Sequence, residues 1–179
     1  GEQLVPVDMA GTDYTVIPLA KSTYESIYIL ALHPATTVTL HNETGEETIL
    51  LDSLQSESHM IKGVTYIHAD AEIQVFQLTN KNGESGGTVL PQMLCTGSYN
   101  VTYKRIPNSD YTILNILTQT ANLGYLYVNG NEIPVENFTL IPGTDGAWSY
   151  VSLDVTAKPA DMPLEVESLR GVFQLGVVD

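Results

Sequence analysis

Apolar and polar residues alternate over short stretches along much of the chain, and groups of turn residues separate these stretches. Residues 37–40 alternate polar and apolar side chains, and residues 48–51 return after a polar turn, as in a hairpin. Residues 125–128 lead into Asn129-Gly130, a pair that tolerates positive φ at both central positions of a type I′ hairpin turn. Thr, Val, Ile and Tyr are abundant, and they suit a pleated sheet better than a helix. The pattern predicts an all-β fold of many short strands.

The sequence also contains signs of an internal repeat. Residues 75–78 and 172–175 are both Val-Phe-Gln-Leu. Three earlier residues, Pro6, Tyr14 and Val16, reappear in the same order and with the same spacing as Pro91, Tyr99 and Val101. A polar, glycine-rich stretch over residues 80–87 separates the copies and is interpreted as a loop or linker. We therefore predict two tandem, similar β-sandwich units with jelly-roll-like pairing, residues 1–84 and 85–179.

Charge excludes several classes of partner. The chain has 7 basic and 21 acidic residues and a formal net charge of −14. A surface of this sign repels phosphate backbones and anionic membrane surfaces, so nucleic-acid binding is excluded. No run of residues approaches the apolar length of a membrane span, so we expect no membrane insertion.

The single cysteine and the start of the chain bear on its context. Cys95 has no second cysteine to pair with inside the chain, which excludes a disulfide framework and a multi-thiolate metal site. Burial as a small apolar side chain is its default role. The chain begins at Gly1 without Met or a leader segment, so we expect it to be a piece of a longer mature protein.

Several motifs follow one another in a fixed order along the two halves of the chain. In the first half they are Val5-Pro6, Gly11-Thr12-Asp13-Tyr14, Thr37-Val38-Thr39 and residues 71–78. In the second half they are Leu90-Pro91 and residues 126–131, 141–144 and 148–153. This order resembles the amino-terminal region of the IgGFc-binding protein family, over nearly the whole chain and as two consecutive repeats near the carboxyl end of a longer array.

The resemblance implies an extracellular, non-enzymatic module with an adhesive or binding role in a secreted or cell-surface protein. The implied partner is a protein or glycan ligand at the cell surface or in mucus, and the founding protein binds immunoglobulin Fc. The resemblance transfers no binding residue. It would also place a second cysteine near residues 107–109 to pair with Cys95, and this sequence has none there.

Aromatic residues beside predicted loops are the strongest ligand candidates. Exposed Tyr or Trp near Asn or Asp is how β-sandwich modules stack on sugars or anchor protein partners. The predicted ligand-binding residues are Trp148, Tyr150, Asp145 and Tyr127. A Trp148 that fills the core is the competing interpretation. A carbohydrate-binding sandwich, assisted by calcium held on loop carboxylates, is therefore the second functional hypothesis, and no other cofactor is expected.

An enzymatic alternative rests on residues 83–87. Gly-Glu-Ser-Gly-Gly resembles the Gly-Asp-Ser-Gly-Gly of trypsin-like proteases, which would make Ser85 a nucleophile. Glu in place of Asp, and the position between two similar halves, favour a linker without chemistry. The spacing of the four histidines matches no recognisable zinc site. We predict no enzyme, no catalytic residue and no metal ligand.

Overall fold

The computed structural model describes residues 6–19, 24–81, 84–94, 96–105, 111–159 and 162–178, with Val7, Tyr24, Asn80, Lys81, Glu84 and Ser85 described by their backbone alone. All regular structure in these ranges is β-strand or short 3₁₀ helix, which confirms the all-β prediction. None of it forms a helix long and apolar enough to cross a membrane. The chain divides into two compact units, Gly1–Cys95 and Thr96–Asp179. Its division into similar repeats at residues 84 and 85 stays a prediction.

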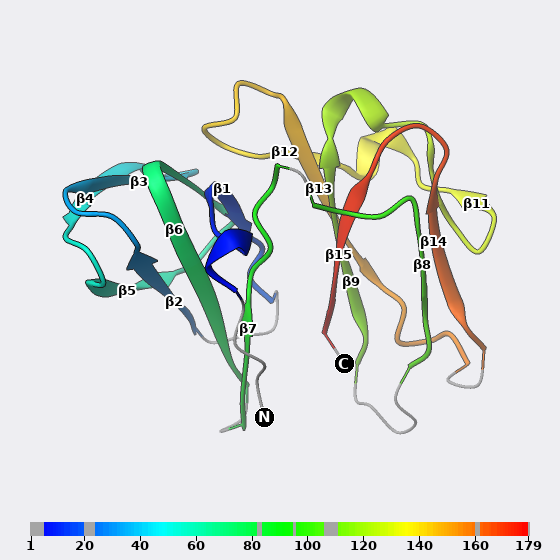
Figure 1. Cartoon of the computed structure of the whole chain (residues 1–179). Coiled ribbons are helices and arrows are strands. Elements are labelled where there is room, and N and C mark those ends of the chain that lie inside the picture. Colours follow the sequence, from blue (N-terminus) through cyan, green and yellow to red (C-terminus); the bar gives the residue numbers. More distant parts are fainter. Residues whose placement is uncertain are drawn as a thin grey trace. The chain divides into compact units, whose positions relative to one another are not determined.

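The first unit is one antiparallel sheet of seven strands. It contains the 3₁₀ helix η1 (Val7–Met9) and the strands β1 (Gly11–Val16), β2 (Tyr24–Ala31), β3 (Thr36–Asn42), β4 (Gly45–Leu51), β5 (Ser56–Ile61), β6 (Thr65–Lys81) and β7 (Glu84–Val89). The strand order is β4-β3-β6-β2-β5, and β1 and β7 also pair with β6. The first half of β6 pairs with β1 and β3, and the second half with β2 and β7 (Figure 1).

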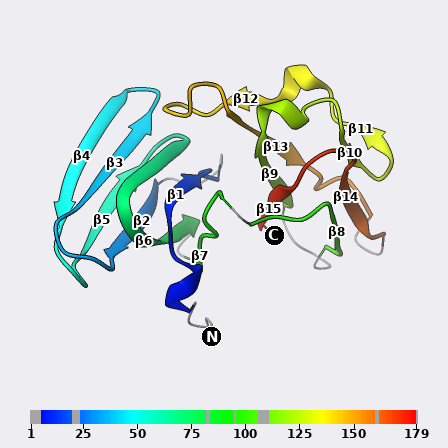
Figure 2. The ribbon, with the colours of Figure 1, turned by 45° about the horizontal axis from the view of Figure 1, so that its top comes forward.

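This sheet curls into half a barrel around its own core. Alternate side chains of β6 point inward and are buried, namely Ile67, Ala69, Ile73 and Val75. The two end strands of the path approach each other, because Glu47 Oε1 on β4 lies 3.8 Å from His59 Nδ1 on β5. Figure 2 shows the strong bend of β6 beside the β3–β4 hairpin. The 17-residue β6 pairs with β1 and β3 along its first half and with β2 and β7 along its second half. The unit is therefore one curled sheet and not the expected two-sheet sandwich.

Strand β7 corrects the interpretation of residues 80–87 as a loop or linker. Residues 84–89 pair with the end of β6, and residues 82–83 lie outside the described ranges. A Cβ on Gly87 would lie only 2.3 Å from Cζ of Phe76, so the ring of Phe76 occupies the space that a side chain would take. This glycine thus serves packing between two strands, which composition alone does not distinguish from linker flexibility.

A bulge interrupts the pairing of β1 with β6. Gly11 pairs with Ile73 and Asp13 with His68, and the register shifts between them. The buried hydroxyl of Tyr14 accepts a hydrogen bond from the N–H of Gly11 at 3.0 Å and donates one to the C=O of Ile73 at 2.8 Å. A side chain therefore satisfies backbone groups that the bulge leaves without a direct partner.

The second unit contains two antiparallel sheets of four strands each. Its elements are β8 (Asn100–Tyr103), β9 (Ile113–Gln119), η2 (Thr120–Asn122), β10 (Leu126–Val128), β11 (Asn131–Glu132), η3 (Val135–Asn137), β12 (Thr139–Leu140), β13 (Trp148–Asp154), β14 (Leu164–Ser168) and β15 (Phe173–Val178). The strand orders are β11-β10-β14-β8 and β12-β13-β9-β15. A buried cluster with members from both sheets forms the core of this unit.

The predicted hairpin at Asn129-Gly130 is confirmed. Strands β10 and β11 pair across it, and φ is 48° at Asn129 and 73° at Gly130. A type I′ turn requires positive φ at both central positions, so the Asn-Gly pair alone was sufficient to predict this turn.

Candidate functional site

A row of polar rings lies on the outer face of the first half of β6. His41 pairs in register with Tyr66, and Asp13 pairs with His68, and residues opposite one another in an antiparallel pair share a face. The ring centroids of His41 and Tyr66 are 5.6 Å apart, and those of Tyr66 and His68 are 6.4 Å apart. A carboxylate lies at each end. Glu46 Oε2 is 3.3 Å from His41 Nδ1, and Asp13 Oδ1 is 3.0 Å from His68 Nδ1.

Asp13 is the most strongly hydrogen-bonded member of this row. Oη of Tyr66 donates to Oδ1 at 2.5 Å, and Oγ1 of Thr12 donates to Oδ2 at 2.6 Å. Burial opposes ionisation, but the hydrogen bonds from Thr12, Tyr66 and His68 outweigh it and hold the pKa of Asp13 below its usual value. Burial, followed by the adjacent carboxylate, raises the pKa of Tyr66. An ionised carboxylate with a lowered pKa is a poor general base, so the cluster is suited to hold three strands in register.

Replacing Asp13 with asparagine is expected to lower the free energy of unfolding by about 1–3 kcal/mol near pH 7, because hydrogen bonds to a charged acceptor are lost. The folded-state pKa lies below the ordinary value of 3.8, so this contribution is present above that pH and is lost as the pH falls through the folded-state pKa. Urea unfolding of the wild type and the variant near pH 7 and near pH 2 measures the loss in free energy of unfolding and its dependence on pH. Asp8→Asn, at an exposed carboxylate on η1, is the control. An equal loss for D13N at both pH values would contradict this electrostatic assignment.

The four histidines all belong to the first unit, and each lies near a carboxylate. The pairs are His33 with Glu72, His41 with Glu46, His59 with Glu47 and Glu57, and His68 with Asp13. Among the described side chains, no three of His, Cys, Asp or Glu gather as a metal ion would require. Each described histidine thus contacts one or two carboxylates on the sheet, without the third ligand that a metal ion would require.

The predicted ligand residues fall into two groups. Trp148 and Tyr150 lie on one face of β13, opposite Gln119 and Leu117 of β9, and both are half-buried. Asp145 is exposed in the turn just before β13, with φ at 50°. Tyr127 lies on β10, in the other sheet of the unit. The structure thus groups Trp148 and Tyr150 and separates Tyr127 from them, and ligand binding by any of the four stays a prediction.

Two further residues singled out in the sequence lie beyond the described atoms. The backbone of Ser85 pairs with Asn80 at the start of β7, but its side chain is outside the described residues. Cys95 also falls outside the described ranges. Their predicted roles stay predictions.

A second surface, on the outer side of the second half of β6, was missed by the sequence analysis. Four strands contribute to it in the order β5-β2-β6-β7. We call it the uncharged face and define it as Ser26, Tyr28, Leu30, Ser56, Ser58, Met60, Gln74, Phe76, Leu78, Gly87 and Val89, which share one side of the sheet by register. None of these residue types ionises at neutral pH, in a chain whose net charge is −14. Alternate uncharged positions are visible within each strand, but nothing in the sequence makes the four strands neighbours.

Antiparallel sheets account for the strands of the described residues and define an all-β protein. Comparison with protein families then gives a family match that includes both units. The family model described as "IgGFc binding protein" matches residues 1–175, so the chain belongs to this family. The resemblance noted in the sequence is thereby confirmed at the level of the family. No curated protein and no solved structure matches the chain significantly.

Proposed function

We propose that the chain is a non-enzymatic adhesion or binding module of a secreted or cell-surface protein. The observation that carries this proposal is the uncharged face, which leaves partly apolar side chains on the outside of an acidic unit. Apolar side chains bordered by polar ones on a surface are typical of binding sites for small ligands as well as for proteins. Family membership over residues 1–175 supports the same role and makes immunoglobulin Fc one partner to test.

A tandem repeat is part of this proposal, and the order of strand pairing supports it. Strand β6 pairs with β1, β2 and the β3–β4 hairpin, and β5 pairs with β2. In the second unit β14 pairs with β8 and with the β10–β11 hairpin, while β9 pairs with β15 and β13. By these pairings β8, β9, the β10–β11 hairpin and β13 correspond to β1, β2, the β3–β4 hairpin and β5, in the same order along the chain. Strands β14 and β15 together correspond to β6. Experimental coordinates in which these frameworks cannot be superposed would overturn the repeat.

The shared Val-Phe-Gln-Leu tetrapeptide does not support the repeat in the same way. Val75 is buried and Phe76 lies on the uncharged face, whereas Val172 is exposed and Phe173 is buried. A shift of one residue moves every side chain of a strand to the other face. The tetrapeptides are therefore out of structural register by an odd number of residues, and pairing order is the better guide.

A second candidate function is carbohydrate binding, with calcium assistance, through the aromatic residues of β13. The observation that favours it is that Trp148 and Tyr150 share one face of the strand, with the exposed Asp145 in the preceding turn. Loss of glycan binding in Trp148→Ala, with binding by the wild type retained in a chelator, would favour a calcium-independent site there. Retention in Trp148→Ala would remove this residue from the hypothesis.

Surface plasmon resonance with the full chain immobilised tests the binding function. The analytes are immunoglobulin Fc and a purified secreted mucin, with serum albumin as the negative control. We expect saturable binding of Fc or mucin and none of albumin. No response from Fc and mucin at their highest soluble concentrations would contradict the proposal.

A further inference from the structure

We propose that the uncharged face binds neutral carbohydrate and that the ring of Tyr28 is the platform on which a sugar ring stacks. This inference rests on the proposed binding function and adds the class of ligand and the site. It concerns the first unit, so it is independent of the aromatic residues on β13.

Tyr28 lies in the middle of the uncharged face and is held there by a neighbour. It pairs with Phe76 on one side and with Ser58 on the other, and the residue is 43% exposed. The Tyr28 and Phe76 rings are tilted at 59° with centroids 6.4 Å apart. Phe76 in turn occupies the space above Gly87. The exposed ring is therefore supported before any ligand arrives, which reduces the ordering cost of binding.

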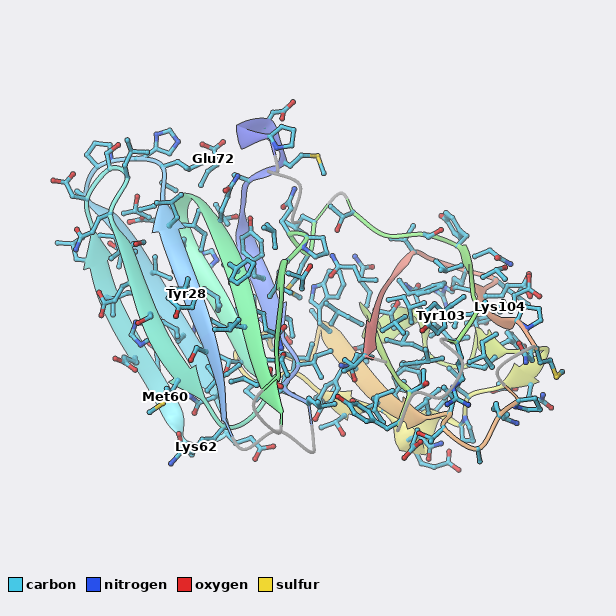
Figure 3. All side chains as sticks on the ribbon, turned by 90° about the horizontal axis from the view of Figure 1, so that it is seen from below. Tyr28, Met60, Lys62, Glu72, Tyr103 and Lys104 are labelled. Carbon is cyan, nitrogen blue, oxygen red and sulfur yellow. The ribbon has the colours of Figure 1, made fainter. Side chains whose placement is uncertain are left out.

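The polar groups around Tyr28 are the hydroxyls of three serines and the amide of Gln74, and they suit an uncharged ligand. Ser58 lies directly across from Tyr28, and Ser26 and Ser56 lie on the same side of the sheet. Each hydroxyl can both donate and accept, as the hydroxyls of a sugar require. Figure 3 shows Tyr28 lying between Glu72 and Lys62, which are well separated from each other. Because the net charge of −14 disfavours anionic ligands, a neutral sugar is favoured over a sialylated or sulfated one.

The size of the exposed apolar area argues against a protein as the partner of this face. Among its described residues, Tyr28 and Met60 are the large apolar ones that are exposed, at 43% and 73%. A stable protein interface buries about 800 Å² on each partner around a dry, apolar core. One aromatic ring with hydroxyls around it is small for that purpose, but it is sufficient to cover one face of a pyranose ring.

Native affinity electrophoresis with the full chain tests the inference. The gels contain mannan, galactan, xylan or amylose, and heparin serves as the anionic comparison. We expect at least one neutral polysaccharide to retard the wild type and heparin to have no effect. Tyr28→Ala is expected to weaken binding about tenfold, which corresponds to about 1.4 kcal/mol. Tyr28→Phe keeps the stacking ring and is expected to remain within about threefold of the wild type.

A matched control distinguishes binding at a specific site from nonspecific binding to exposed tyrosines. Tyr125 in the second unit is 42% exposed, and Cζ of Arg170 lies 5.3 Å from its ring centroid. Tyr125→Ala removes an equally exposed tyrosine that is not part of the uncharged face, so its retardation should equal that of the wild type. Circular dichroism of Tyr28→Ala checks that the variant is folded, and Tyr28→Phe keeps the test valid if it is not.

Three outcomes would overturn the inference. They are no retardation of the wild type by any neutral polysaccharide, unchanged retardation in Tyr28→Ala, and a dimer in sedimentation that Tyr28→Ala abolishes, which would assign the face to a second copy. If Fc or mucin still binds Tyr28→Ala while the neutral polysaccharides fail to bind the wild type, this inference fails and the proposed binding function stands. If the wild type binds neither Fc, mucin nor polysaccharide, both fail.

Discussion

Replacing Phe173 with alanine is expected to lower the free energy of unfolding of the second unit by about 3–5 kcal/mol, because the change removes a large buried side chain and leaves a cavity. Phe173 is 1% exposed and belongs to the buried cluster to which both sheets of that unit contribute. Its backbone N–H and C=O both bond to Ser98 at 2.9 Å, so the strand position itself is well anchored. The cavity therefore cannot be closed by a simple shift of β15.

Urea unfolding followed by fluorescence measures this loss in the appropriate unit. Trp148 is the single tryptophan of the chain, and it lies on β13 in the same sheet as Phe173. Val172→Ala, one residue earlier at a side chain that is 38% exposed, is the matched control and should change the free energy of unfolding by less than about 1 kcal/mol. Equal effects of the two substitutions would show that Phe173 does not fill the core.

Replacing Tyr14 with phenylalanine is expected to cost about 2–4 kcal/mol, although the change removes a single oxygen atom. The Tyr14 hydroxyl accepts a hydrogen bond from the Gly11 N–H and donates one to the Ile73 C=O at the bulge of β1. Tyr14 itself is 1% exposed, so water cannot readily replace the lost oxygen. A buried backbone group left without a partner costs about 1–3 kcal/mol, and here two are affected.

Thermal or urea unfolding followed by circular dichroism measures the effect of Tyr14→Phe. The control is Tyr28→Phe, which removes the hydroxyl of an exposed tyrosine in the same unit and should leave the free energy of unfolding within about 0.5 kcal/mol of the wild type. A loss for Tyr14→Phe no larger than that of the control would mean that the bulge is satisfied in another way.

Local patterns in the sequence were sufficient for the fold class and for both predicted hairpins, β3–β4 and β10–β11. Alternation of apolar and polar residues is a property of the strand itself, and Asn129-Gly130 is the local requirement of its turn, so both could be recognised without knowing any neighbour. The family, too, could be recognised from motifs that lie close together along the chain, and it is confirmed over residues 1–175.

The candidate sites depended on which strands became neighbours. Asp13 and Tyr66 are 53 positions apart in the chain, and Asp13 and His68 are 55 apart, yet they share hydrogen bonds on one face. Tyr28, Ser58, Phe76 and Gly87 come from four strands and form one uncharged surface only through their register. No single stretch of sequence contains either arrangement.

The sequence by itself thus determined that the chain forms strands, where one tight turn falls, and to which family it belongs. The tertiary structure decided which side of each strand faces outward, and the opposite orientations of Phe76 and Phe173 within the same tetrapeptide show this directly. The physical reason is that alternation sets two faces for every strand, but pairing with distant strands selects which of the two is buried.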